Sequence, residues 1–293
     1  MPSLPTAPTT KPERPLQPKQ TSWASLPHDW LIPDWPAPSH VRAVCTTRRS
    51  RGAPLWGDTS NTPACESGWV DYGFNLGDHV GDDPERVACH RQELAQGLGL
   101  EPCWMQQVHG TDVLYLDSPG HLMSLTQPPC ADACWTKRPG QACSILVADC
   151  LPILLTDLNG TFAAGAHAGW RGLAQGVVEA LWSAVKPQPD QVLAWLGPCI
   201  GPTAFEVGAD VKTAFEKRHP EATACFKAHT TSGKWLADLT GLARQHLQRL
   251  GVRHIYGNDG SLPWCTYRNP SNFFSFRRDG VCGRMVACIG LLG

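Results

Sequence analysis

The chain has 293 residues, and 42% of them are hydrophobic, which is enough for the core of one large domain or two small ones. Its 25 basic and 26 acidic residues leave a formal net charge of −1. This balance argues against a nonspecific nucleic-acid binder, because such a protein needs a basic excess to displace counterions. Thirteen cysteines without a C-x-x-C pair predict reduced, mostly buried thiols rather than a secreted disulfide scaffold.

The N-terminal part of the chain is predicted to be a disordered, proline-rich tail. Residues 1–20 contain six prolines and no apolar block long enough for the core of an export signal. The longest apolar stretch, 143–155, is interrupted by an aspartate and a proline, so it cannot span a bilayer. We therefore expect residues 1–39 to form the tail and residues 40–293 a single domain of a cytoplasmic protein without membrane contact.

The domain is predicted to mix strands and helices. In chain order, the predicted strands are 41–47, 113–116, 144–148, 151–156, 162–167, 192–196, 252–256 and 285–291, with a loop over 50–72. One helix is predicted to begin at Asp83-Pro84-Glu85, a second to cover 173–185, and a third to run from Leu236 to Leu250. Because helices and strands do not alternate strictly, the pattern favours an α+β fold of packed layers over a doubly wound sheet.

A predicted hairpin brings a cysteine close to a histidine. Asn159-Gly160 is a strong two-residue turn signal, and cross-strand partners around it have numbers that sum to 319. Cys150 then faces Gly169, so Cys150 and His167 are diagonal neighbours on one face of the hairpin. Both could bind one metal ion, form a thiolate–imidazolium pair, or be an ordinary core thiol and a satisfied buried histidine. Spacing alone leaves His109 and His79 as alternative third ligands.

The residues after the hairpin resemble an anion site. Gly165, Gly169 and Gly172 leave open backbone beside His167, as a ligand pocket requires. Arg171 places a guanidinium where the predicted helix begins, a combination that suits phosphate. The alternative role for Arg171 is a surface ion pair.

Several motifs of this chain resemble the laccase-domain, or polyphenol oxidase, family. They lie at 75–77, 79–82, 107–110, 148–150, 166–172, 196–202, 274–280 and 283–284, and together they cover roughly residues 40–293 in the family's order. Members of this family are described as zinc-dependent purine nucleoside phosphorylases with adenosine deaminase activity, and some bacterial members as peptidoglycan editing factors.

The resemblance implies which residues form the site. It implies zinc ligands at His109, Cys150 and His167, and a layered α/β sandwich similar to the catalytic domain of cytotoxic necrotizing factor toxins. The residues assigned to substrate binding are Arg48, Asn75, His79, Gln107, Arg171 and Arg284. The chain departs from the family pattern at 49–52, where glycines are expected, and at Cys282, where the family has threonine.

We expect a zinc enzyme acting on purine nucleosides and inorganic phosphate, with phosphorolysis of adenosine and inosine and deamination of adenosine. Cys150 and His167 are the predicted catalytic pair, with Asp132 as general acid or base. A multicopper oxidase is excluded because the chain has no H-x-H pair and only four methionines, although Cu²⁺ could occupy the site adventitiously. The alternatives are a Cys–His amide hydrolase that edits cell-wall precursors and a non-catalytic metal-binding protein.

Overall fold

A computed structural model of the chain describes residues 29–49, 72–118 and 128–293. The strands are β1 Val41–Cys45, β2 Glu101–Cys103, β3 Val113–Tyr115, β4 Ala133–Thr136, β5 Gln141–Val147, β6 Leu151–Asp157, β7 Ala163–Ala168, β8 Val192–Leu196, β9 Glu206–Gly208, β10 Phe226–Ala228, β11 Lys234–Ala237, β12 His254–Gly257 and β13 Met285–Leu291. The α-helices are α1 Pro84–Leu98, α2 Trp170–Gln175, α3 Val177–Val185, α4 Ala209–Glu216, α5 Leu239–Arg249 and α6 Phe276–Asp279.

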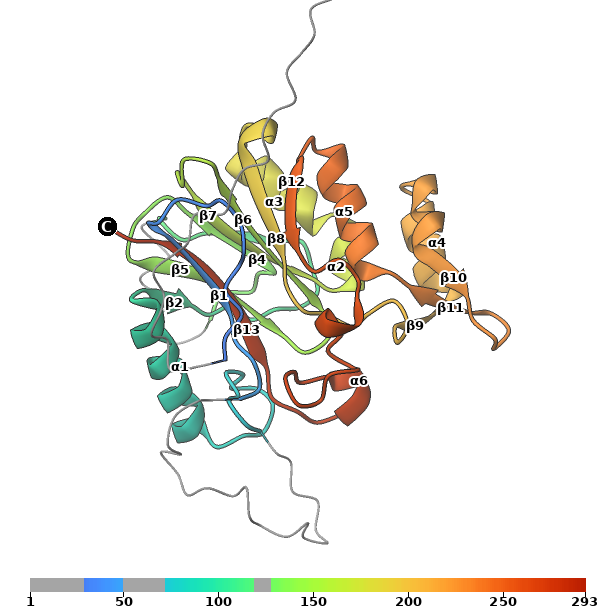
Figure 1. Ribbon diagram of the computed structural model, residues 1–293, viewed down its shortest axis with the longest axis horizontal. Coiled ribbons are helices and arrows are strands. Elements are labelled where there is room, and N and C mark those ends of the chain that lie inside the picture. The colour runs from blue at the N-terminus through green and yellow to red at the C-terminus, as the bar shows by residue number, and fades with distance from the viewer. Residues whose placement is uncertain (1–28, 50–71, 119–127) are drawn as a thin grey trace, which may run out of the picture.

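Two sheets pack face to face between layers of helix, so the α+β class is confirmed (Figure 1). One sheet has four strands in the order β1-β13-β5-β2, and the other has six in the order β12-β8-β6-β7-β4-β3. Helix α1 covers the outer face of the four-stranded sheet, and α2, α3 and α5 cover the outer face of the six-stranded sheet. A third, small sheet, β10-β11-β9, lies with α4 beside this body.

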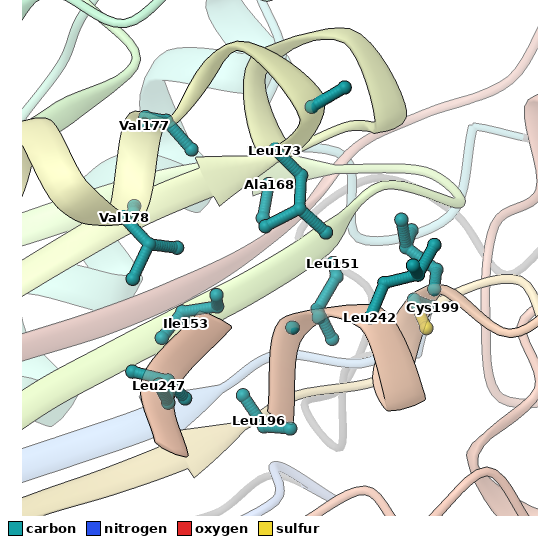
Figure 2. Close-up of a cluster of buried hydrophobic side chains, with 14 of the residues drawn as sticks. Leu151, Ile153, Ala168, Leu173, Val177, Val178, Leu196, Cys199, Leu242 and Leu247 are labelled. Carbon is teal, nitrogen blue, oxygen red and sulfur yellow. The ribbon is translucent and has the colours of Figure 1, made fainter. Parts of the chain in front are cut away.

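The central strands are buried on both faces. In β6, the side chain of Leu154 enters the core between the sheets, whereas Ile153 and Leu155 enter the core under the helices. Figure 2 shows that helical core, in which Leu242 and Leu247 of α5 pack with side chains of the six-stranded sheet. Burial on both faces explains why the central strands read as continuous apolar runs in the sequence.

The first helix begins as its sequence predicts. The side chain of Asp83 accepts a hydrogen bond from the Glu85 N–H, Pro84 occupies the first helical position, and Gly99 closes the helix with φ 66°. Its apolar stripe of Val87, Leu94 and Leu98 is buried, and the latter two pack against the four-stranded sheet.

Two predicted helices differ from the structure. The helix predicted over 173–185 is interrupted at Gly176, where φ is 100°, so α2 and α3 are separate helices. A Cβ at Gly176 would lie 2.8 Å from the Arg218 guanidinium, so tertiary packing at this break favours glycine. Leu236 belongs to β11 rather than to the third helix, because the Asp238 side chain caps α5 by accepting from the Gly241 N–H.

The packed body begins before residue 40. Leu31 pairs with Cys45 of β1, and Trp30 and Trp35 are each only 6% exposed. Trp35 lies in the core between the two sheets. The segment 29–39 is therefore part of the domain, and the part of the predicted tail over residues 1–28 lies outside the described residues, as do residues 50–71 of the predicted loop.

The cysteines of the described part of the chain fit the predicted reduced state. All twelve are free thiols, and seven of them are buried. In the same part of the chain, no helix is long and apolar enough to cross a membrane.

Candidate metal centre

The predicted register between the two hairpin strands is confirmed, although the turn has a different form. Pro152 pairs with His167, and every pair in the β6–β7 ladder sums to 319. The ladder ends at Leu155, and the wider connection contains a turn in which the Gly160 N–H donates to the Asp157 carbonyl at 3.0 Å. Only the second of the two predicted turn residues has positive φ, at 64°. The predicted two-residue turn and the wider observed connection both contain an even number of residues, so the same residues pair in the two strands.

His109, Cys150 and His167 converge at one end of the central strands of the six-stranded sheet. Cys150 immediately precedes β6, His167 lies near the end of β7, and His109 lies in the loop before β3. The ligand atoms of all three side chains lie within 4.8 Å of one another. The Cys150 Sγ and the His109 Nε2 are 3.6 Å apart, and the two imidazole rings meet edge to face with centroids 4.7 Å apart.

Asp132 positions both histidines. Its carboxylate accepts a hydrogen bond from the His167 Nδ1 at 2.8 Å, and also from the backbone N–H groups of Val108, His109 and Gly110 at 2.7–3.1 Å. Three consecutive N–H groups on one carboxylate hold His109 in a left-handed conformation with φ 61°. Because the Nδ1 of His167 is engaged, its Nε2 is the nitrogen that can face a metal ion.

The cluster is polarised as a thiolate–imidazolium pair. Burial raises the pKa of the Cys150 thiol, but the charge and hydrogen bonds of His167 and His109 outweigh burial and lower this pKa to about 6. Burial lowers the pKa of His167, but Cys150 and Asp132 outweigh it and raise this pKa to about 9. Burial also raises the pKa of Asp132, yet the hydrogen bond from His167 and those from the backbone leave it below its usual range.

Two glycines make room for this arrangement. A Cβ at Gly169 would lie 2.8 Å from the His109 Cδ2 and 3.0 Å from the Cys150 Sγ. A Cβ at Gly172 would lie 2.9 Å from the Gly110 carbonyl oxygen. The glycines after β7 therefore allow the turn into α2 to pass close to His109 and Cys150, whereas Gly165, the third predicted glycine, faces Ile145 and Cys143 in the core between the sheets.

Comparison with known proteins identifies the family. Residues 59–292 match the family described as multi-copper polyphenol oxidoreductase laccase. The chain belongs to this laccase family. It is 42% identical to a purine nucleoside phosphorylase of Pseudomonas aeruginosa over 262 residues, which are 89% of this chain and 98% of the relative. It is also 42% identical to the purine nucleoside phosphorylase YfiH of Escherichia coli strain K12 over 264 residues, with the same coverage.

Solved structures share the fold of this laccase-family chain. A Neisseria meningitidis protein matches with a TM-score of 0.77 and 42% identity, over 90% of this chain and 100% of that one. The protein YlmD of Geobacillus stearothermophilus matches with a TM-score of 0.73 and 29% identity, over 95% of this chain and 100% of that one.

The donor set at the site fits one divalent transition metal rather than several coppers. Two imidazoles and one thiol lie within reach of one ion, and a carboxylate accepts from the outer nitrogen of one imidazole. Three such donors would leave the fourth position of a tetrahedral zinc ion open. The described residues offer only one other cluster of metal donors, formed by Glu179, His219 and His246. Neither cluster supplies enough histidines for a trinuclear copper centre.

The predicted substrate residues separate into two groups. The amides of Gln107 and Asn75 bind the protein itself: Gln107 exchanges two hydrogen bonds with the Leu146 backbone at 2.7 and 2.8 Å. Asn75 is fully buried and bonds to the backbone of Gly77 and Arg284. These two side chains hold loops in place at the ends of β5 and β13.

Three of the other four predicted substrate residues are cations. Arg171 is exposed, lies over the Trp170 ring at 4.7 Å, and has no carboxylate within ion-pair distance among the described residues. Arg284 donates to the Cys282 and Gly283 carbonyls at 2.8 and 3.1 Å. Arg48 donates to the Pro270 carbonyl at 2.9 Å. His79 is 57% exposed beside Asp78 and does not belong to the group formed by His109, Cys150 and His167.

Sequence reasoning missed the role of Asp149, the residue before Cys150. Asp149 has φ 92°, a strained conformation for a non-glycine residue, and its carboxylate accepts from the Thr266 hydroxyl at 2.5 Å and the Arg277 N–H at 2.7 Å. It thereby ties α6 and the loop around Thr266 to the strand connection that carries Cys150. The only sequence signal was its place in the Ala148-Asp149-Cys150 motif.

Proposed function

We propose that this chain is a zinc-dependent purine nucleoside phosphorylase. In this reaction phosphate attacks the ribose C1′, the glycosidic bond breaks, and the purine leaves with the bonding electrons and takes up a proton. The observation that carries the proposal is the convergence of His109, Cys150 and His167 in a chain with 42% identity to relatives named purine nucleoside phosphorylases. We extend it to adenosine and inosine as substrates and to a second, deaminating activity on adenosine.

Three side chains of the chain would bind the zinc ion. His109, Cys150 and His167 would hold the zinc. The low pKa of Cys150 favours the thiolate that metal binding requires, whereas His167, with its pKa raised to about 9, would release a proton when it binds the metal. Zinc, when bound, supplies a Lewis acid beside the open side of these three donors. Cu²⁺ would be an adventitious occupant of the same donors.

Asp132 is better suited to positioning than to proton transfer. Both of its carboxylate oxygens accept hydrogen bonds from the protein, and its side chain is fully buried. We therefore assign it the orientation of His167 and of the loop that carries His109. The general acid or base is left unassigned.

Arg171 is the strongest candidate for binding phosphate. Arg171 is exposed and follows Gly169 by two residues, and Gly169 lies against the proposed ligands His109 and Cys150. Helix α2 has only six residues, so the guanidinium rather than the helix dipole carries this assignment. Arg48 and Arg284 are further candidates, although both already donate to backbone carbonyls.

A second candidate function is amide hydrolysis by the Cys150–His167 pair, for example on a cell-wall precursor. The observation in its favour is the triad-like order of the thiol, the imidazole and the Asp132 carboxylate, with a Cys150 pKa of about 6. The free thiols also favour a reducing, cytoplasmic location for either activity.

One experiment separates these functions. Zinc-loaded and metal-depleted protein are incubated with inosine or adenosine, with and without phosphate, and ribose 1-phosphate, free base and ammonia are measured. We expect phosphate-dependent ribose 1-phosphate only from the metal-loaded protein. Amidase activity that survives metal depletion and disappears on alkylation of Cys150 would favour the hydrolase, and no turnover at all would favour a non-catalytic metal-binding protein.

A further inference from the structure

A second cluster of metal donors lies in the helical layer of the molecule. Glu179 is on α3, His246 is on α5, and His219 follows α4. The ligand atoms of these three side chains lie within 4.8 Å of one another. Figure 1 shows α4 and the small sheet beside α5, at the side of the body, so the cluster joins segments from different parts of the fold.

We propose that Glu179, His219 and His246 form a second binding site for a divalent transition metal, independent of the proposed phosphorylase activity. Two imidazoles and one carboxylate are a donor set that proteins use for zinc. The Glu179 Oε1 and the His246 Nδ1 share a hydrogen bond of 2.6 Å. Two ligands of a tetrahedral zinc ion lie about 3.3 Å apart, so a bound ion would replace this hydrogen bond after a small separation of the two side chains. The imidazoles of His219 and His246 meet edge to face, with centroids 5.3 Å apart.

One oxygen of the Glu179 carboxylate has no hydrogen-bond donor among the described residues, although the side chain is 29% exposed and the charge of Arg218 acts on it. The Glu179 Oε2 is buried and accepts no hydrogen bond from any residue that the structure describes. Leaving a buried carboxylate oxygen without a partner is unfavourable, and native proteins rarely do so. A metal ion bound by the carboxylate would satisfy this oxygen or neutralise its charge.

The His246 ring is held in place for such a role. It is 2% exposed, and the Phe215 ring packs edge to face against it at 6.3 Å. Its neighbour His219 is anchored through its backbone, since the His219 N–H donates to the Phe215 carbonyl at 3.0 Å. Restrained side chains lose little conformational entropy when they bind a metal ion.

The protonation states of the cluster also suit a metal. Burial raises the pKa of the Glu179 carboxyl. The hydrogen bond and charge of His246 and the charge of Arg218 outweigh burial, so this pKa lies below its usual range. Burial, together with the charges of Arg249 and His246, lowers the pKa of His219, so this imidazole is neutral and able to donate a lone pair.

Two arginines stand near the cluster, and both are engaged. Arg249 pairs with the Glu221 carboxylate at 2.7 Å, which offsets its charge. Arg218 donates to the Ala174 carbonyl at 3.2 Å on the side of Gly176. A bound metal would join α3 and α5 to the chain after α4, and so fasten the small sheet to the body.

The test is metal stoichiometry with spectroscopic separation of the two sites. Protein freed of metal is titrated with Co²⁺, whose thiolate ligation at Cys150 gives a charge-transfer band that imidazole and carboxylate ligands do not give. We expect two equivalents per chain in the unmodified protein, one with the charge-transfer band and one with d–d absorption alone. Equilibrium dialysis with Zn²⁺ should likewise give two ions per chain.

The variant His219→Ala should lose the second equivalent while it keeps the charge-transfer band. Its side chain is 25% exposed, so the substitution should leave the fold intact, and the affinity of the second site should fall at least about tenfold. The control His229→Ala changes another partly exposed histidine, which pairs with Glu206 outside the cluster, and should keep both equivalents. A single equivalent in the unmodified protein, or a second one that persists in both His219→Ala and His246→Gln, would overturn the proposal.

Discussion

At the scale of single residues, Asp132 links the two histidines of the candidate metal centre. One of its oxygens accepts from both the His167 ring and the His109 backbone, and the other accepts from the Val108 and Gly110 backbone. The orientation of one ligand and the backbone conformation of the other therefore depend on a single carboxylate. Such outer partners of a ligand tune metal affinity although they do not touch the metal.

Asp132→Asn should weaken metal binding about 10- to 100-fold. The amide replaces one acceptor oxygen with an N–H₂ group that faces N–H donors, which also costs about 1–3 kcal/mol of folding stability. Competition with a chromophoric zinc chelator measures the affinity, and urea unfolding measures the stability. Unchanged zinc affinity in the variant would show that Asp132 does not position the ligands.

Gly169→Ala should disturb the ligands without disturbing the backbone. The residue has φ −64°, which alanine adopts readily, but its Cβ would meet His109 at 2.8 Å and Cys150 at 3.0 Å. We expect a loss of metal affinity of at least about tenfold. The control is Gly110→Ala, whose Cβ would meet nothing closer than 3.4 Å. Equal effects of the two substitutions would argue that crowding of the ligands is not the cause.

Arg171→Lys should weaken the use of phosphate more than it weakens deamination. Lysine keeps the charge but loses the planar pair of donors, which costs about 1.5–3 kcal/mol, or roughly 10- to 150-fold in phosphate-dependent efficiency. Both activities are measured across a phosphate titration. Arg253→Lys is the control, since Arg253 is exposed and precedes β12, at the opposite end of the strands from the candidate metal ligands. Equal losses of both activities in Arg171→Lys would point to a structural role.

At the scale of elements, the segment before β1 contributes to the core. Leu31 pairs with Cys45, and Trp35 fills space between the two sheets next to β1 and β13. Composition did not reveal this, because the proline-rich sequence carries neither a helical nor an alternating pattern. A few large apolar residues can anchor such a segment when the body offers a groove for them.

Trp35→Ala should destabilise the domain by about 3–5 kcal/mol, because it removes a large aromatic side chain from a packed core. The nearby control Ile32→Ala changes a side chain that is 39% exposed and should cost less than about 1 kcal/mol. Urea unfolding followed by tryptophan fluorescence and by circular dichroism measures both. A small effect of Trp35→Ala would mean that the segment is only loosely attached.

At the scale of the whole molecule, the candidate metal centre lies where the chain passes from one sheet to the other. β5 belongs to the four-stranded sheet and β6 to the six-stranded sheet, and Cys150 lies in the short connection between them. His109 approaches from a loop that Asp132 holds, and His167 from the end of β7. A metal ion at this point would join three separate parts of the fold.

Metal removal should therefore lower both activity and stability. A ligand present at 100 times its dissociation constant stabilises the folded state by about 2.7 kcal/mol, which corresponds to a shift of roughly 5–10 °C in Tm for a chain of this size. Thermal unfolding with zinc, with a chelator and after reloading with zinc measures the shift. A Tm that does not respond to the chelator would contradict a metal ion that joins these elements.

The sequence by itself determined the features that depend on neighbouring residues. The capping of α1 by Asp83, the bounds of β8 and β13, and the register that places Cys150 near His167 all follow from local patterns. Caps, turns and apolar periods act over a few residues, so one sequence is enough to locate them. Among the short strands, β3 and β12 were predicted, whereas β2 and β4 carry too little pattern to be located in this way.

Only the tertiary structure decided how distant segments meet. It separated β5 and β6 into different sheets, interrupted the helix at Gly176, and placed the Asp132 carboxylate against the His167 ring. It also brought Glu179 of α3 to His246 of α5, a pair 67 residues apart in the chain. These outcomes depend on burial, strand pairing and hydrogen bonding between residues far apart in the chain, which no local pattern of residue types encodes.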